Sequence, residues 1–356
     1  MILYPLEFEP IYKSKIWGGD NLKRVYKRNL PGNKIGESWE LAAHPHGTSV
    51  IANGPYKGKT LLELIKENPE PLLGKRIKSE NQQTFPLLIK FIDANDRLSV
   101  QVHPDNEYAR EEKNEYGKTE MWYILEAKPG AKLIYGLKNG TTEETLARAI
   151  EKGQIELYLN EVEVKKGDIF FIPAGTVHAI GEGILLAEIQ QNSDTTYRLY
   201  DWIRKGEDGK GRELHIEKAL AVIDFKRKSN HTHSRPLVKD NGDYTRAFLA
   251  ACPYFVTEKI NTKTAYQLNL SGDRFYILIN LAGEGDLICA NKNYQLNPGK
   301  TYFLPAGLEQ IQIKGRAEFL LTYIPGNKKD VIESLIEAGF TEEETKTLAG
   351  MENWDI

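Results

Sequence analysis

Short apolar runs separated by turn-forming residues dominate two stretches of the chain, residues 85–200 and 245–325. The runs are rich in Val, Ile, Phe and Tyr, and Gly, Pro and Asn bound them. Short strands with frequent turn signals are typical of an all-β sandwich or barrel. The pattern therefore predicts a mainly β protein. The runs that carry this prediction are FPLLIKFID, EMWYILEA, AKLIYGL, DIFFIPA, RFYILINLAG and KTYFLPA.

Helical periodicity appears only locally. In the second of four candidate segments, Thr142 is followed three residues later by Thr145 instead of Glu or Gln, so we expect no complete capping box there. Glu143 and Glu144 still favour the first turn, because carboxylates stabilise a helix N-terminus. The candidate helices are residues 60–74, 141–153, 213–225 and 328–348.

The chain carries one strand–turn unit twice. Residues 165–183, KKGDIFFIPAGTVHAIGEG, are nearly repeated by residues 297–315, NPGKTYFLPAGLEQIQIKG. When the copies are aligned on Pro-Ala-Gly, His178 corresponds to Gln310. The duplication indicates two homologous β-domains, of which only the first carries the histidine.

The repeat sets the expected domain limits. We expect an N-terminal domain at residues 1–240, with N-terminal strands and small helical segments. A C-terminal domain with a terminal helix follows at residues 241–356. The polar, breaker-rich stretch at 226–242 is the expected linker between the two domains.

Composition narrows the class of protein. The 356 residues carry 47 basic and 50 acidic side chains, interspersed, with a net charge of −3. This balance lacks the strongly basic face of a general nucleic-acid binder. The N-terminus has no long apolar signal-peptide core, and no apolar run approaches the roughly 20 residues needed to span a bilayer. Two cysteines, Cys252 and Cys289, are too few for a disulfide framework. We therefore expect a soluble, cytoplasmic protein without nucleic-acid or membrane partners, and its sequence is compatible with a monomer.

Several polar residues interrupt the strands of the first copy. Gln101 and His103 are two residues apart, as are Lys118 and Glu120, and residues two apart in a strand share one face. The two imidazoles of His103 and His178 and the carboxylate of Glu120, with the amide of Gln101, form a plausible ligand set for a divalent ion such as zinc, with an open position for chemistry. The alternative is that the histidines are hydrogen-bonded core residues and that the polar pairs are solvated strand faces.

The spacing of these residues resembles a known superfamily. The pattern G-x5-P-x-G-x2-H, from Gly167 to His178, is similar to the second cupin motif. His103, Glu120 and Gly130 resemble the first motif, although Gln-x-His replaces the usual His-x-His and the gap to the glutamate is longer.

Gln-x-His-Pro followed by Lys-x-Glu resembles the type I phosphomannose isomerases in particular. The resemblance runs from about residue 13 to 225, and a degenerate second cupin extends it to the C-terminus. The chain looks like the short bacterial form. The supporting stretches are KIWGGDNL (15–22), IGESWELAAHPHG (35–47), GKTLLELI (58–65), PLLIKFIDANDRLSVQVHPDNEYA (86–109) and NSDTTYRLYDW (192–202).

This resemblance implies a fold of two cupin-like jelly-roll β-barrels with a few peripheral helices. It also implies one Zn²⁺ per chain in the first barrel, because Gln310 replaces the motif histidine in the second. Lys118 and Arg198 match positions in the family's substrate cavity, Asp194 matches a further position in the site, and Trp17 matches a position near the entrance. The implied metal ligands are Gln101, His103, Glu120 and His178.

The implied activity is the reversible aldose–ketose isomerisation of mannose 6-phosphate and fructose 6-phosphate. A proton moves between C1 and C2 through a cis-enediol, and a divalent metal acts as a Lewis acid. Lys118 and Arg198 would supply positive charge to the phosphate or the enediolate. We prefer an acid–base role for Asp194, with Lys118 assisting.

Two other functions fit parts of the pattern. A non-catalytic sugar-binding cupin would not need Lys118, Glu120, Asp194 and Arg198 together. An iron-dependent oxygenase is disfavoured by the Gln101 ligand and by the arginine. His44 and His46 also share a strand face, and we favour a structural or surface role for that pair.

Overall fold

The computed structural model describes residues 1–77, 84–113, 115–205, 209–227 and 235–355, and it divides into two compact units. Unit 1 comprises Met1–Ile11, Glu40–Leu88 and Ser234–Ile356, and unit 2 comprises Tyr12–Trp39 and Ile89–His233. These units interleave along the chain, whereas the domains expected at 1–240 and 241–356 are contiguous. The expected limits stay a prediction.

Unit 1 is built on a ten-stranded antiparallel sheet with the order β16-β17-β18-β23-β20-β22-β1-β6; β19 pairs with β23 and β21 with β20. The strands are β1 (Leu6–Glu9), β6 (Val50–Ile51), β16 (Leu237–Asp240), β17 (Tyr244–Ala251), β18 (Val256–Thr262), β19 (Ala265–Asn269), β20 (Tyr276–Cys289), β21 (Lys292–Leu296), β22 (Thr301–Leu304) and β23 (Gln310–Tyr323). A small hairpin adds β4 (Ala43–His44) and β5 (Gly47–Thr48), and the helices are α2 (Leu61–Glu67), α3 (Pro69–Leu73), α7 (Lys328–Glu337), α8 (Glu342–Thr345) and the 3-10 turns η1 (Gly54–Tyr56) and η4 (Met351–Asp355).

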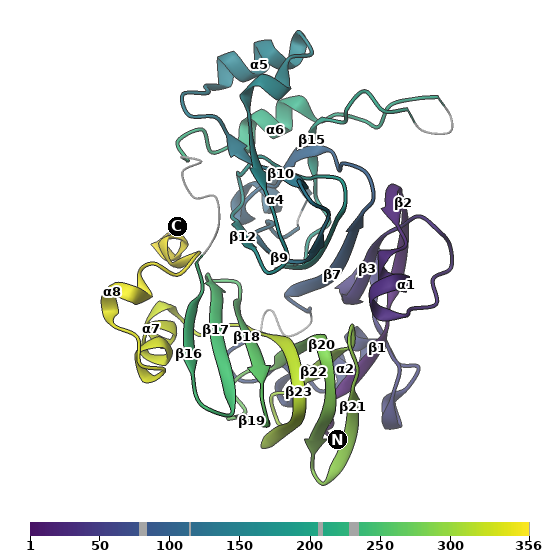
Figure 1. Cartoon of the computed structure of the whole chain (residues 1–356), viewed down its shortest axis with the longest axis vertical. Helices are drawn as coiled ribbons and strands as arrows, with labels where there is room; N and C mark the ends of the chain where they lie inside the picture. Colours follow the sequence, from purple (N-terminus) through teal and green to yellow (C-terminus); the bar gives the residue numbers. More distant parts are fainter. Residues whose placement is uncertain (78–83, 114, 206–208, 228–234, 356) are drawn as a thin grey trace. The chain divides into compact units, whose positions relative to one another are not determined.

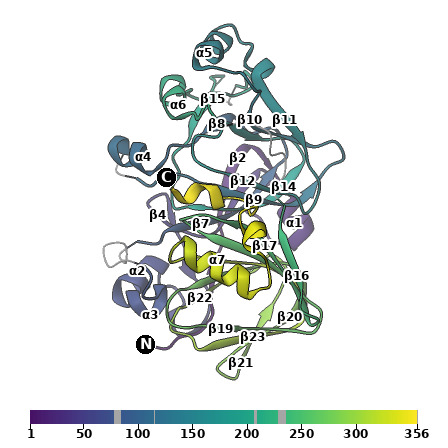
Figure 2. The same cartoon turned by 90° about the vertical axis from the view of Figure 1, so that its left-hand side faces the viewer.

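The C-terminal helices of unit 1 cover part of its sheet. Val331 and Leu335 of α7 pack in one apolar cluster with Phe248 of β17 and Val256 of β18. The yellow helices lie beside β16 and β17 in both views (Figures 1 and 2). This apolar face explains why a polar-looking C-terminal sequence folds as a helix, since tertiary packing supplies most helix stability.

Unit 2 contains two antiparallel sheets, with the orders β11-β10-β13-β8-β15 and β12-β9-β14-β7-β2-β3. The first sheet consists of β8 (Val100–Val102), β10 (Lys132–Leu137), β11 (Leu159–Glu163), β13 (His178–Ile180) and β15 (Tyr197–Tyr200). The second consists of β2 (Ile11–Gly19), β3 (Ile35–Leu41), β7 (Leu87–Ala94), β9 (Glu120–Ala127), β12 (Ile169–Ile172) and β14 (Ile184–Gln191). Its helices are α1 (Asn21–Tyr26), α4 (Asn106–Lys113), α5 (Glu143–Glu151), α6 (Ile216–Val222) and the 3-10 turn η3 (Ile155–Tyr158).

The apolar core of unit 2 lies between these two sheets. Trp122 and Phe170 of the six-stranded sheet share one buried cluster with Leu133 and Ile180 of the five-stranded sheet. The opposite face of the five-stranded sheet packs a second cluster, to which α5 and α6 contribute Leu146 and Ala219. In Figure 1, α5 and α6 lie on the same side of β10 and β15. The mainly β fold predicted from the apolar runs is confirmed.

All four predicted helical segments contain helices. Residues 60–74 form α2 and α3, and residues 328–348 form α7 and α8. The expectation for the start of α5 was wrong, because Thr145 Oγ1 accepts from Thr142 N at 2.9 Å and Thr142 Oγ1 accepts from Thr145 N at 3.2 Å. A threonine therefore completes the capping box in place of Glu or Gln. No helix within the described ranges is long and apolar enough to cross a membrane.

The expected linker at 226–242 includes residues 228–234, which lie outside the described residues. The part that follows is not a loop, since Leu237–Asp240 form β16 and pair with Thr245–Phe248 of β17. Val238 and Asp240 point to solvent, as expected for a polar strand at the edge of a sheet.

Candidate metal centre

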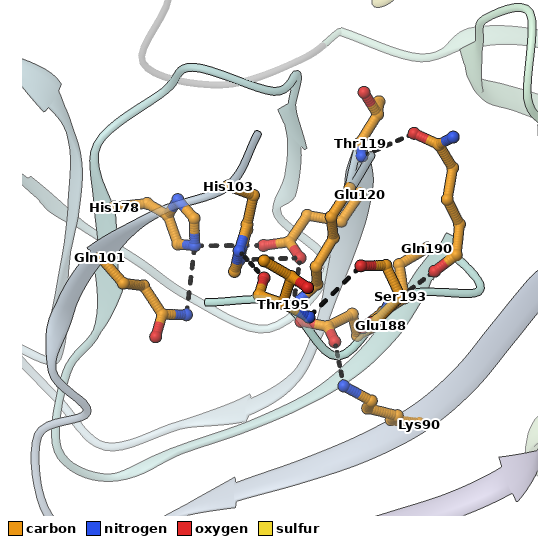
Figure 3. A network of polar contacts seen from close by, with 12 residues as sticks. Lys90, Gln101, His103, Thr119, Glu120, His178, Glu188, Gln190, Ser193 and Thr195 are labelled. Carbon is orange, nitrogen blue, oxygen red and sulfur yellow. Dashed lines mark hydrogen bonds and ion pairs between the residues drawn. The ribbon is translucent and has the colours of Figure 1, made fainter. Parts of the chain in front are cut away.

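Three buried side chains meet between the two sheets of unit 2 (Figure 3). His103 directly follows β8, Glu120 is the first residue of β9 and His178 is the first residue of β13. One ligand atom from each lies within 4.8 Å of the other two. Short strands with ends at the same place therefore bring together residues that are 75 positions apart in the sequence.

Each imidazole is oriented by a backbone carbonyl. His103 Nδ1 lies 2.8 Å from the oxygen of Thr195, and His178 Nδ1 lies 2.8 Å from the oxygen of Thr176. A carbonyl only accepts, so each Nδ1 carries the proton and each Nε2 keeps its lone pair. Burial lowers the pKa of His178 to about 4 and that of His103 well below its usual value, so both rings are neutral at pH 7. This is the form in which imidazoles bind metal ions.

The Nε2 lone pairs of both rings lie near the carboxylate of Glu120. His178 Nε2 lies 3.4 Å from Oε1, and His103 Nε2 lies 3.7 Å from Oε2. Within the described part of the chain, His103 Nε2 and Glu120 Oε1 have no hydrogen-bond partner, and Glu120 Oε2 is in an ion pair with Lys118 Nζ at 3.2 Å. Burial raises the pKa of Glu120 to about 7, against the opposing effect of Lys118. Two neutral imidazoles and a carboxylate that face one another form a donor set suited to a divalent metal ion.

Gln101 lies next to His178, at the edge of this group of three side chains. It lies opposite His178 in the register of β8 and β13, and its Nε2 is 3.3 Å from His178 Nε2. In this orientation the amide points its donor at the histidine. A half-turn of the terminal amide exchanges Nε2 and Oε1, and Gln101 then offers an oxygen ligand.

A buried chain of charges lies beside the metal group and was missed by the sequence reasoning. Lys90 Nζ lies 3.3 Å from Glu188 Oε1 and 3.9 Å from Glu37 Oε2, and all three side chains are buried. Burial alone lowers the pKa of Lys90, but Glu188 and Glu37 outweigh it and raise that pKa. The available signal was a single lysine inside the apolar run FPLLIKFID, because lysine is almost never fully buried unless it is paired.

The other charged residues predicted for the site also lie in unit 2. Lys118 Nζ is 3.2 Å from Glu120 Oε2. Arg198 lies opposite Gln101 in the register of β15 and β8, so both side chains share one face of the sheet. Asp194 is half-buried between β14 and β15, and its charge helps to raise the pKa of Lys90.

Trp17 and the second histidine pair occupy different environments. The indole of Trp17 is 3% exposed and packs in the apolar core, so a contact with substrate stays a prediction. His44 Nδ1 accepts from His46 N at 3.1 Å, and the two rings pack edge to face at 4.8 Å. The pair thus closes the turn between β4 and β5, which is a structural role.

In the second copy of the repeat, Gln310 is exposed at the start of β23 and lies opposite Asn269. Across the described residues, the cluster of His103, Glu120 and His178 is the one group of three His, Cys, Asp or Glu residues with metal-binding geometry. One ion per chain stays a prediction.

Comparisons with known proteins agree on one family. The family model "Phosphomannose isomerase type I, catalytic domain" matches residues 6–132, and "Mannose-6-phosphate isomerase, cupin domain" matches residues 244–324. The chain is 42% identical to "Mannose-6-phosphate isomerase ManA" of Bacillus subtilis over 91% of its length and 100% of that protein's. It is 39% identical to "Mannose-6-phosphate isomerase" of Streptococcus mutans over 90% of this chain and 98% of that one.

A solved structure shows the same fold. The crystal structure of the mannose 6-phosphate isomerase from Bacillus subtilis superposes with a TM-score of 0.82 at 35% identity, covering 89% of this chain and 99% of that chain. The bacterial relatives match nearly end to end, which confirms the short bacterial form. This chain therefore belongs to the type I phosphomannose isomerase family.

Proposed function

We propose that this chain interconverts mannose 6-phosphate and fructose 6-phosphate. One observation carries the proposal: the buried group of His103, Glu120 and His178 has unsatisfied acceptors that face one another, in a chain 42% identical to a curated mannose-6-phosphate isomerase. A site of this kind suits an aldose–ketose isomerase, because charge develops on the C1 and C2 oxygens during proton transfer.

His103, Glu120 and His178 would hold the metal, with Gln101 as the fourth ligand. When bound, the ion supplies a Lewis acid that polarises the oxygens at C1 and C2. Two imidazoles, a carboxylate and an amide are nitrogen and oxygen donors, and this set suits Zn²⁺. We propose one Zn²⁺ per chain.

Arg198 and Lys118 are the proposed partners of the substrate's negative charges. Arg198 Nε donates to Ser99 Oγ at 3.2 Å and Nη1 donates to the oxygen of Glu213 at 2.7 Å, which fixes the plane of the guanidinium. In the part of the chain that the structure describes, Nη2 keeps its donors for the phosphate. Lys118 contacts Glu120, so its ammonium group lies where it can stabilise the enediolate oxygen.

Proton transfer is assigned to Asp194. Its carboxylate lies in the same polar interior as Lys90, on the segment that leads into the strand of Arg198. We propose that Asp194 takes the proton from C2 of the open-chain aldose and returns it to C1 of the cis-enediol. Lys118 stabilises the charge that remains on oxygen.

A deuterium-exchange assay tests this function. Mannose 6-phosphate is converted in D₂O, and the fructose 6-phosphate formed is analysed by NMR. Deuterium at C1 is expected, because a carboxylate proton exchanges with solvent at the enediol stage. A folded, metal-loaded protein that forms no fructose 6-phosphate would contradict the proposal.

We also place this activity in the cytoplasm, in a protein that acts as a monomer. Cys252 and Cys289 are both buried free thiols, as is usual in a reducing compartment. Every metal donor comes from one chain, so the site needs no partner subunit.

A further inference from the structure

A carboxylate just beyond β15 binds two arginines. Asp201 Oδ2 accepts from Arg212 Nε at 2.8 Å, and Oδ1 accepts from Arg212 Nη2 at 2.6 Å. Arg204 Nη2 also donates to Oδ1. Burial raises the pKa of Asp201, but its hydrogen bonds with Arg212 and Arg204 outweigh burial and lower it, so the side chain is charged at pH 7.

These contacts lead to Arg198. Arg212 precedes Glu213, and the oxygen of Glu213 accepts from Arg198 Nη1 at 2.7 Å. The backbone two residues after Glu213 also bonds to Arg198, because His215 N donates to the oxygen of Arg198 at 2.8 Å. Asp201 therefore anchors, through Arg212, the backbone carbonyl that fixes the Arg198 guanidinium.

The backbone of this anchor is held in an uncommon conformation. Trp202 and Ile203 follow Asp201 with φ of 56° and 55°, in the left-handed region that residues with a Cβ rarely adopt. Trp202 Nε1 donates to the oxygen of Leu98 at 2.6 Å, and the Arg97 guanidinium stacks 3.9 Å above the indole. Backbone strain of this kind persists only where surrounding contacts enforce it, and it is often associated with functional sites.

The charges give Asp201 a second effect on the same site. Burial lowers the pKa of Arg198, and the positive charges of Arg212 and Arg204 lower it further. Asp201 is the carboxylate that pairs with both of these arginines. Without it, Arg212 would lose its anchor and three guanidinium groups would repel one another.

We propose that Asp201 is a positioning residue for phosphate recognition. It holds Arg212, and through Arg212 the carbonyl of Glu213, so that Arg198 presents Nη2 to the substrate phosphate in a fixed direction. This inference rests on the proposed function, in which Arg198 binds the phosphate. A fixed guanidinium binds phosphate more tightly than a mobile one, because less side-chain entropy is lost on binding.

The test compares Asp201→Asn and Arg212→Gln with Arg198→Gln and the wild type, all loaded with metal. KM and kcat are measured for mannose 6-phosphate, and the inhibition constant for inorganic phosphate is measured separately. We expect Asp201→Asn to raise both KM and the inhibition constant about tenfold, about 1.4 kcal/mol of binding, with kcat within about twofold. Arg212→Gln should give the same shift, and the double variant no more than either single variant, because both act through one carbonyl.

Glu258→Gln is the matched control. Glu258 of β18 also accepts Nε and Nη2 of one arginine, Arg246, at 2.6 and 2.8 Å, but it lies in unit 1. This variant should lose thermal stability as Asp201→Asn does and leave KM and phosphate inhibition unchanged. If Glu258→Gln raises KM as much as Asp201→Asn, the effect is general destabilisation and the positioning role is wrong.

Arg198→Gln distinguishes the phosphate-binding role of Arg198 from the positioning role of Asp201. If it leaves phosphate inhibition unchanged, Arg198 does not bind the phosphate, and the positioning role fails with that assignment. If Arg198→Gln weakens phosphate binding while folded Asp201→Asn does not, only the positioning role fails. Should Asp201→Asn not fold, Arg212→Gln decides, because it releases the same carbonyl while Asp201 stays paired with Arg204.

Discussion

Gln101 and His178 lie opposite each other on neighbouring strands, with their Nε2 atoms 3.3 Å apart. The pair explains why a chain with two copies of one turn keeps the histidine in only one of them. His178 meets Gln101, His103 and Glu120 between two sheets, whereas Gln310 of the second copy is exposed and faces Asn269. Among the residues that the structure describes, the position of His178 is grouped with other candidate metal donors and that of Gln310 is not.

Replacing His178 should remove the metal. His178→Gln deletes one of the two neutral imidazoles, and we expect metal affinity to fall by more than about 100-fold, because loss of even an outer-shell partner costs 10- to 100-fold. Metal content after purification and a competition titration with a chelator measure this. His44→Gln is the control, since His44 is also buried but bonds to the backbone of His46. Equal metal loss in both variants would contradict the assignment.

Metal affinity should depend on pH through Glu120. The pKa of Glu120 in the metal-free protein is about 7, so below pH 7 it holds a proton that the ion must displace. Burial lowers the pKa of His178 to about 4 and that of His103 well below its usual value, so Glu120 is the ligand that takes up a proton near pH 7. The logarithm of the association constant should rise by about one per pH unit up to pH 7 and then level off. A slope near three below pH 6.5 would show instead that both histidines titrate as well.

Asp194→Asn should abolish turnover without removing the metal. An amide cannot take a proton, and we expect kcat to fall by about 100- to 10,000-fold, the usual contribution of a general base. Metal content should match the wild type, because Asp194 is not among the clustered donors. Turnover within a few-fold of the wild type would transfer the base role to another residue, with Lys118 as the next candidate.

The grouping of His103, Glu120 and His178 was predictable in part, because local rules place each of them near a strand end and the family resemblance links them as ligands. Residues two apart in a strand share a face, so Gln101 and His103 were expected on one side, and the Pro-Ala-Gly turn fixed the start of the strand of His178. The mainly β fold was predictable for the same reason, since strand runs and turns are local signals. The helices α1 and α4 were missed, because Asn21–Tyr26 and Asn106–Lys113 lack a wide apolar stripe.

The pairing of the buried charges could be recognised only once the tertiary fold was known. Lys90, Glu188 and Glu37 come from β7, β14 and β3, and no spacing within one strand relates them. The pairing of Asp201 with Arg212, 11 residues later, is likewise a contact that sequence spacing alone does not specify. The interleaved units of the chain also arise from long-range contacts, because the described residues 40–77 and 84–88 group with the C-terminal sheet in unit 1.

Lys90 should be important for stability. Lys90→Met leaves Glu188 buried without its cation, whereas Glu37 keeps Lys15 Nζ at 2.8 Å. Breaking a buried ion pair costs about 3–5 kcal/mol of unfolding free energy. Lys128→Met is the control, because Lys128 pairs with Glu182 while both side chains are about 60% exposed, and such a pair contributes about 1 kcal/mol or less. Urea unfolding of both metal-free variants measures the difference. Equal losses would show that the buried chain of charges does not stabilise the fold.

The most direct test of the proposed function is a coupled assay of mannose 6-phosphate conversion to fructose 6-phosphate. The protein is assayed as purified, after chelation and after Zn²⁺ is restored. We expect activity that disappears with the chelator and returns with Zn²⁺. No conversion by folded protein with one Zn²⁺ bound would contradict the isomerase assignment, and full activity after complete metal removal would contradict the role of His103, Glu120 and His178.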